Sequence, residues 1–423
     1  MSIRPRAAVP EILSQHLDDA IVLRGVRSVL VTSPHAKLHQ LARTDERLAA
    51  HLDGLSVSGE HGVTLSTAAL ESPGLGQIFV SGLLALERRD AAQIERLLAL
   101  VGVVPEAERA LSSAFGWAAA PLLRGLTGTL LRGATPAARW LGIAACAQHR
   151  VDPGDALPAA LADTDALLRR RALRAAGELG RHDLLPQVLA QADDPDPAAG
   201  LAASASAVRL GDRSQALEHL RKVAVQPGPL QAEALMLSLF TADAEAARAL
   251  VRQLAPGGSP MRTLIRAAGW AGDAHVVPWL LNHMKADPKL ARVAGEAFSF
   301  ITGADLAYLD LDRKPPEGEV FGPNDDPAEA DVAMDEDDGL PWPDADKLAA
   351  WWQMQGSRFT PGTRYFVGEP PSVAHCLSVL KNGFQRQRMA AADYLCLLAP
   401  GTALFNAAAP AWRQQRQLAQ MQA

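Results

Sequence analysis

The sequence predicts an all-helical protein built as an α-solenoid, a stack of short helical hairpins. The first observation behind this prediction is composition: alanine supplies 79 of 423 residues, while aromatic residues make up only 5%. This balance favours close-packed helices, because strands are rich in aromatic and β-branched residues. The second is a turn signal that recurs about every 30 residues. The third is an acidic, proline-rich segment that interrupts the helical pattern late in the chain.

Residues 1–80 do not follow the repeat. Apolar residues stand at helical spacing over residues 10–31, among them Leu13 and Leu17, and residues 36–52 form a second helical stretch. The terminal units of a solenoid differ from the others because they shield the end of the stack. We therefore interpret residues 1–80 as an N-terminal helical cap.

The repeats occupy residues 81–309 and are regular from about residue 134. Equivalent turn positions fall at Gly180, Gly211, Ala242, Gly272 and Gly303, in steps of 31, 31, 30 and 31 residues. Each turn closes a predicted first helix. These first helices are predicted at residues 169–179, 201–210, 232–241, 262–271 and 291–302. A second segment follows, often with proline near its start, where the missing N–H costs nothing. Two antiparallel helices per unit are typical of an α-solenoid, and the short unit resembles HEAT-like repeats of the short bacterial type.

Residues 310–346 form an acidic insertion. They hold 14 acidic and 2 basic residues and six prolines, whereas residues 1–309 are neutral and residues 347–423 carry a net charge of +6. Such a segment buries too little apolar surface to offset the entropy of ordering it, so we predict irregular structure over residues 313–341. It is either a solvated linker or an acidic arm that docks on a basic surface. We expect its carboxylates to be exposed, and the candidate partner-binding residues are Glu317, Glu319, Asp325, Asp326, Glu329, Asp331, Asp335, Glu336, Asp337 and Asp338.

The helical pattern resumes in residues 347–423. Helices are predicted at residues 385–398 and near 411–421, which we interpret as C-terminal repeats, so that the acidic segment is an insertion within one array. Trp351 and Trp352 lie in a further helix that opens at Pro343-Asp344, and we expect both indoles to pack in the core.

No set of residues predicts catalysis, a metal site or a cofactor. The phosphate-binding, nucleophile-elbow and zinc motifs are missing from the sequence. His35 and His39 share a helical spacing, with Asp45 as an imaginable third ligand, but no cysteine or second histidine pair completes a metal site. His375 and Cys376 are adjacent and would point apart on a helix. We therefore expect a protein that is not an enzyme.

Other reactive or charged groups have plain structural interpretations. We expect His149, His182 and His275 to be exposed near turns, and the basic run at residues 169–171 to be a solvated face. Three cysteines exclude a disulfide framework. The N-terminus lacks the apolar run of a secretory signal, and no apolar stretch is long enough for a membrane span. These observations predict a soluble cytoplasmic protein.

Four segments resemble a family of bacterial HEAT-like-repeat proteins found beside type VI secretion genes. They are residues 48–55 (LAAHLDGL), residues 297–306 (AFSFITGADL), residues 340–344 (LPWPD) with the two tryptophans at 351–352, and residues 387–401, which begin QRMAAA and end PG. The segments extend along nearly the whole chain. Within this family the chain resembles an immunity protein that neutralises a secreted DNase toxin.

The resemblance implies a protein partner, a secreted nuclease toxin, with no direct contact to nucleic acid or membrane. A toxin that cuts DNA presents a basic groove, and carboxylates arranged like phosphates can fill such a groove. A scaffold or effector-loading adaptor of the secretion system is the alternative, and an enzyme similar to the HEAT-like bilin lyases is a third class. The oligomeric state is not predicted.

Overall fold

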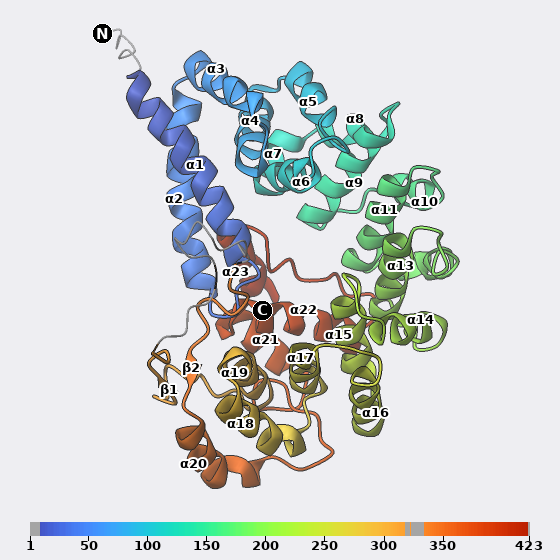
Figure 1. Ribbon diagram of the computed structural model, residues 1–423. Helices are drawn as coiled ribbons and strands as arrows, with labels where there is room; N and C mark the ends of the chain where they lie inside the picture. The colour runs from blue at the N-terminus through green and yellow to red at the C-terminus, as the bar shows by residue number, and fades with distance from the viewer. Residues whose placement is uncertain (1–8, 318–321, 323–333, 422–423) are drawn as a thin grey trace. The chain divides into compact units, whose positions relative to one another are not determined.

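The computed structural model describes residues 9–317, 322 and 334–421 of the chain. Helices follow one another through nearly all of these residues (Figure 1). The strands of the described residues are two antiparallel dipeptides, β1 (Asp312–Arg313) and β2 (Trp342–Pro343). The prediction of an all-helical protein is therefore confirmed. Within the described parts of the chain, no helix has both the length and the apolar character needed to cross a bilayer.

The chain divides into two compact units, each containing segments that are distant in sequence. Unit 1 contains residues 1–32, 36–206 and 401–423, and unit 2 contains residues 33–35 and 207–400. Helix α13 (Pro197–Arg209) begins in unit 1 and ends in unit 2. The other helices of unit 1 are α1 (Pro10–Leu30), α2 (Leu38–Val57), α3 (Glu60–Ala68), η1 (Ala69–Glu71), α4 (Leu75–Arg88), α5 (Ala91–Leu98), α6 (Ala107–Trp117), α7 (Ala120–Leu123), α8 (Leu126–Leu131), α9 (Pro136–His149), α10 (Ala156–Leu161), α11 (Ala166–Glu178), η2 (His182–Leu184), α12 (Leu185–Leu189) and α23 (Ala411–Met421).

Unit 1 begins with the two helices that the first 52 residues predict. Helices α1 and α2 pack as an antiparallel pair, and α2 buries Leu41, Leu48 and Leu55, which share one face because they recur every seven residues. Helix α4 packs on both α1 and α6, α6 packs on α9, and α9 packs on α11. Longer helices thus contact one another in succession along the unit.

Unit 2 continues with helices of similar length. Its helices after α13 are α14 (Gln215–Ala224), α15 (Gln231–Thr241), α16 (Ala244–Leu254), α17 (Met261–Ala271), η3 (Ala274–Val276), α18 (Val277–Ala286), α19 (Pro288–Thr302), α20 (Ala345–Gln355), η4 (Gly356–Arg358), α21 (Val373–Asn382) and α22 (Gln385–Leu398). Helix α15 packs on α17, and α17 packs on α19. Helix α16 contacts α15 and α17, and α18 packs on α19.

The predicted first helices coincide with α11, α13, α15, α17 and α19 to within a few residues at each end. The turns that close α17 and α19 are left-handed, with φ of +72° at Gly272 and +74° at Gly303. Glycine adopts this conformation without strain, which explains why the sequence places it there. Ala242, which replaces glycine in the pattern, follows α15 with φ of −74° and extended backbone.

In unit 2, residues 359–369 run across the C-terminal ends of three of these helices. We call them the return segment. The Arg364 guanidinium donates to the carbonyl oxygens of Phe240, in the last turn of α15, and of Ala242, directly after it. The Tyr365 N–H donates to the Gly272 carbonyl at 2.8 Å, and the Val367 N–H donates to the Phe300 carbonyl at 2.7 Å. The return segment thus satisfies carbonyl groups that helix ends leave unpaired.

Residues 401–413 do the same within unit 1. The Leu404 N–H donates to the carbonyl of Glu178 at the end of α11, at 3.0 Å. Further along, the Arg413 guanidinium donates to the carbonyl of Gly116 in α6, at 2.7 Å. Helices α22 and α23 lie where the sequence predicts them. The return segment, which precedes α22, and residues 401–413, which follow it, donate hydrogen bonds to backbone carbonyls at the ends of earlier helices.

The core of unit 2 confirms the interpretation of the tryptophan pair. Trp351 and Trp352 of α20 pack edge-on against the fully buried Phe298 of α19, with ring centroids 5.5 and 6.4 Å apart. The same cluster contains Phe359 and Tyr365 of the return segment. Helix α20 is therefore held to α18 and α19 by aromatic packing.

Candidate partner-binding site in the acidic loop

The two short strands close a loop that holds the candidate partner-binding residues. Asp312 pairs with Pro343, and Arg313 pairs with Trp342, so residues 314–341 leave and re-enter unit 2 at one place. We call these residues the acidic loop. Its sequence contains ten acidic residues and one basic residue. The Asp344 N–H donates to the Leu311 carbonyl at 2.9 Å and reinforces the base.

Five of the ten candidate residues can be located. Glu317 is exposed beside β1, and the other four occupy consecutive positions 335–338 in a turn before β2. The remaining five, Glu319, Asp325, Asp326, Glu329 and Asp331, lie outside the described residues.

The turn at residues 335–338 is anchored by arginines of α17 and α19. Arg292 donates two hydrogen bonds to the Asp335 carboxylate, at 2.7 and 3.0 Å. Arg262 donates two to the Asp337 carboxylate, at 2.7 and 2.8 Å. The Asp337 side chain is completely buried, and Arg292 also donates to its backbone carbonyl at 3.1 Å. Such two-pronged guanidinium–carboxylate pairs combine charge attraction with fixed geometry.

Glu336, between these two aspartates, forms longer and more exposed ion pairs. Glu336 lies 3.4 Å from Arg266 and 3.7 Å from Arg262, and its side chain is 62% exposed. Ion pairs between exposed groups contribute little to stability, because solvent screens the charges. Asp338 is exposed. The expectation that all four carboxylates are exposed is therefore wrong for Asp335 and Asp337.

The electrostatics of this anchor follow from its geometry. Although partial burial acts in the opposite direction, the hydrogen bonds from Arg292 hold the pKa of Asp335 below its ordinary value. The hydrogen bond to Asp337 raises the pKa of Arg262. A carboxyl group whose pKa is lowered by folding stabilises the fold above the pKa it has when unfolded. That stabilisation is lost as the pH falls through the pKa of the folded state.

The sequence contained a signal for this anchor. Arg262 and Arg292 are 30 residues apart, close to the spacing of the recurring turns, and they lie in α17 and α19, which pack on each other. The Arg292 guanidinium also lies 4.6 Å from the centre of the Trp342 ring, so β2 contributes a cation–π contact to the same site.

Histidines in the described parts of the chain bond to neighbouring groups of the fold. No cluster of three metal-ligating side chains occurs there. His35 lies 2.8 Å from the Ser33 hydroxyl. His149 is half-buried, with its Nε2 2.8 Å from the Phe115 carbonyl oxygen, and burial lowers its pKa, so the expectation that it is exposed is wrong.

The other histidines singled out in the sequence and the three cysteines lie as follows. His182 and His275 are exposed, as expected. His375 lies 2.7 Å from the Phe366 carbonyl oxygen. All three cysteines are buried, and burial raises the pKa of Cys146 and Cys376 to about 11.

The basic run is not a free solvated face. Arg169 pairs with Asp194, which lies in the turn between α12 and α13. Arg170 pairs with Glu108 of α6, and Arg171 pairs with Glu178 of its own helix. Arg169 and Arg170 therefore tie α11 to other parts of unit 1, while Arg171 pairs within the helix.

Comparisons with protein-family models, curated proteins and solved structures give no match for this chain.

Proposed function

We propose that this chain is an immunity protein that binds a cognate type VI secretion toxin, a DNase, in the cytoplasm and blocks its DNA-binding surface. The observation that carries the proposal is the acidic loop, which is closed at its base by β1 and β2 and anchored at one end by Arg262 and Arg292. Binding loops on rigid scaffolds are a common way to present a recognition surface.

The charge of the loop supports a basic partner. Arginines of unit 2 pair with Asp335, Glu336 and Asp337. The other seven acidic residues of the loop include Glu317 and Asp338, both exposed, and the five outside the described residues. An excess of carboxylates on one loop attracts a DNA-binding groove and speeds association at low salt.

The repeating helical pairs support the same role. We interpret them as a HEAT-like α-solenoid, in which each hairpin contacts its neighbours and the stack offers an extended binding surface. The resemblance to immunity proteins of type VI secretion systems, carried by the four segments quoted above, supplies the class of partner. The chain itself would then have no catalytic activity.

The proposal predicts a gene for a nuclease-toxin domain beside the gene for this chain, and the test uses that domain. We expect the purified chain to protect a plasmid from that nuclease at an equimolar ratio and to form a complex with it on gel filtration. The loop variant replaces Glu319, Asp325, Asp326, Glu329 and Asp331 with Gln or Asn. Its association rate with the nuclease at low ionic strength should fall by about tenfold, because electrostatic steering raises the association rate of oppositely charged proteins by at least that factor.

A matched control changes net charge equally without touching the loop. Asp18, Glu46, Asp53, Glu87 and Glu95 are exposed residues of unit 1, and the same replacements there should leave the association rate within about twofold. Equal rates for the loop and control variants would remove the loop from the binding surface. A stable complex in which the nuclease stays active would instead identify an adaptor.

A further inference from the structure

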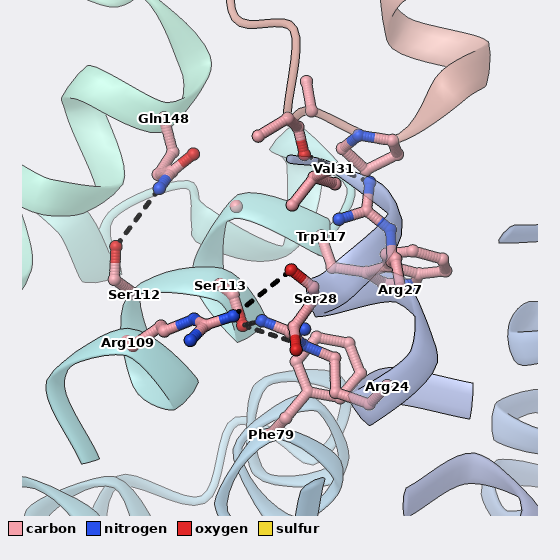
Figure 2. Close-up of a pocket in the computed structure, with 14 residues that line it drawn as sticks. Arg24, Arg27, Ser28, Val31, Phe79, Arg109, Ser112, Ser113, Trp117 and Gln148 are labelled. Carbon is pink, nitrogen blue, oxygen red and sulfur yellow. Dashed lines mark hydrogen bonds between the residues drawn. The ribbon is translucent and has the colours of Figure 1, made fainter. Parts of the chain in front are cut away.

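A pocket in unit 1 concentrates positive charge. It has a volume of about 190 Å³ and is lined by α1, α4, α6 and the end of α9, together with residues 408–410 of the returning chain. Polar side chains on its wall include Arg24, Arg27, Ser28, Arg109, Ser112, Ser113 and Gln148, and the apolar wall contains Val31, Phe79, Trp117 and Pro410. Figure 2 shows the guanidinium groups of Arg24 and Arg109 coming together beside Ser28 and Ser113.

Arg24 is the central feature of this pocket. Only 4% of its surface is exposed. Its Nε and Nη2 donate to the Ser113 hydroxyl at 3.2 and 2.9 Å, while its buried Nη1 has no hydrogen-bond partner among the described residues. No acidic residue is among those that line the pocket, although the charges of Asp45 and Glu106 act to raise the pKa of Arg24. A buried guanidinium without a counter-ion is costly, and proteins usually compensate such a charge.

The neighbouring arginines add to this charge. Arg27 is paired with the buried Asp45 at 2.6 Å, so its charge is compensated. Arg109 is exposed, and its Nη2 donates to the Ser28 carbonyl at 3.4 Å. Burial and the charges of Arg27 and Arg109 lower the pKa of Arg24 to about 9. Two guanidinium groups, those of Arg24 and Arg109, therefore meet in the pocket without a carboxylate between them.

The donors present specify the chemistry of the missing partner. The Nη1 of Arg24 and the remaining N–H groups of Arg109 can donate to oxygen, whereas the Ser28 and Ser113 hydroxyls already donate to the carbonyls of Gly25 and Ala110. Two guanidinium groups in a pocket that no acidic residue lines suit a phosphate monoester, which carries a charge of about −1.5 to −2 at neutral pH. Arginine binds phosphate oxygens in a two-pronged geometry. The pocket is smaller than the roughly 300–1,000 Å³ pockets that take drug-sized ligands, so it suits a small anion.

We propose that this pocket binds a phosphoryl group, with Arg24 and Arg109 as its principal donors and Ser113 and Ser28 at its rim. The group belongs to free phosphate or to a small phosphate monoester. This inference does not depend on the role of the acidic loop. Bound anion would satisfy the Arg24 guanidinium and hold α1 against α6, because Arg24 lies on α1 and its partner Ser113 lies on α6.

The experiment is calorimetric titration of the full chain with inorganic phosphate, in buffer whose ionic strength is kept constant with sodium chloride. Phosphate should bind, and it should raise the melting temperature of the parent chain. Arg24→Gln and Arg109→Gln should each weaken binding at least tenfold, since each removes a direct charged donor. Arg43→Gln is the matched control, because Arg43 is an exposed arginine of α2 outside the pocket, and it should bind like the parent.

The two sources of phosphoryl group are separated by a second probe. Glycerol 3-phosphate that binds more tightly than inorganic phosphate would assign the pocket to a monoester, and weaker binding would assign it to phosphate itself. Failure of the parent chain to bind either probe would overturn the proposal. So would unchanged phosphate affinity in Arg109→Gln, which changes an exposed side chain and is expected to fold even if Arg24→Gln does not.

Discussion

At the scale of single residues, burial decides what each charge does. Asp337 and Asp338 are adjacent carboxylates in one acidic run, yet the first is completely buried against Arg262 and the second is exposed. Arg24 and Arg27 lie one helical turn apart on α1, and only Arg27 has a carboxylate partner. An aspartate is thus a structural anchor or a solvent-facing charge, and an arginine is an ion-pair partner or a candidate ligand donor, depending on what packs around it.

The neighbouring aspartates give the first prediction. Asp337→Asn should lower the free energy of unfolding by about 3 kcal/mol, because it leaves the Arg262 guanidinium without its buried counter-charge. Asp338→Asn, the matched control, should change it by no more than about 0.5 kcal/mol. Denaturant unfolding followed by circular dichroism measures both. Equal effects of the two substitutions would show that the ion pair does not anchor the acidic loop.

At the scale of elements, helix ends determine how the chain is held together. Gly272 closes α17 with a left-handed backbone, and its carbonyl accepts the N–H of Tyr365 in the return segment. A Cβ at Gly272 would overlap the carbonyl oxygen of Tyr365. Gly258 is equally left-handed, with φ of +80°, but nothing lies within 4 Å of the place where its Cβ would be. The two glycines therefore separate backbone strain from packing.

This contrast makes the second prediction. Gly258→Ala should cost about 1 kcal/mol of unfolding free energy, which is the cost of a left-handed conformation for a residue with a Cβ. Gly272→Ala should cost about 2 kcal/mol more, because it also displaces the return segment from α17. Thermal and denaturant unfolding of the two variants provide the comparison. Identical losses would mean that the return segment adds nothing to the stability of unit 2.

At the scale of the whole molecule, both units depend on chain that follows the acidic loop. In unit 2 the return segment bonds to the ends of α15, α17 and α19. In unit 1 residues 404 and 413 bond to the ends of α11 and α6. The acidic loop joins the part of the chain that carries the predicted repeats to the part that contacts their helix ends.

Limited proteolysis tests this dependence. With a protease specific for glutamate, we expect early cleavage in the acidic loop at residues before Asp335, since Asp335 and Asp337 are held by arginines. The two fragments should remain associated on gel filtration and separate only in denaturant, because each unit contains contacts from both fragments. Fragments that separate under native conditions would show that the C-terminal part folds as an independent domain.

The sequence by itself determined the all-helical fold, the positions of α11, α13, α15, α17 and α19, the turns after them and the place of the acidic loop. These features depend on local spacing of apolar residues, on glycine at left-handed positions and on charge density, all of which can be read within a few tens of residues. Only the tertiary structure decided which carboxylates are buried, where the return segment runs and which arginines meet around Ser113. Those outcomes join residues 43 to 124 positions apart, from Arg292 with Asp335 to Phe240 with Arg364. No local pattern specifies such pairs, because they form only when distant helices pack.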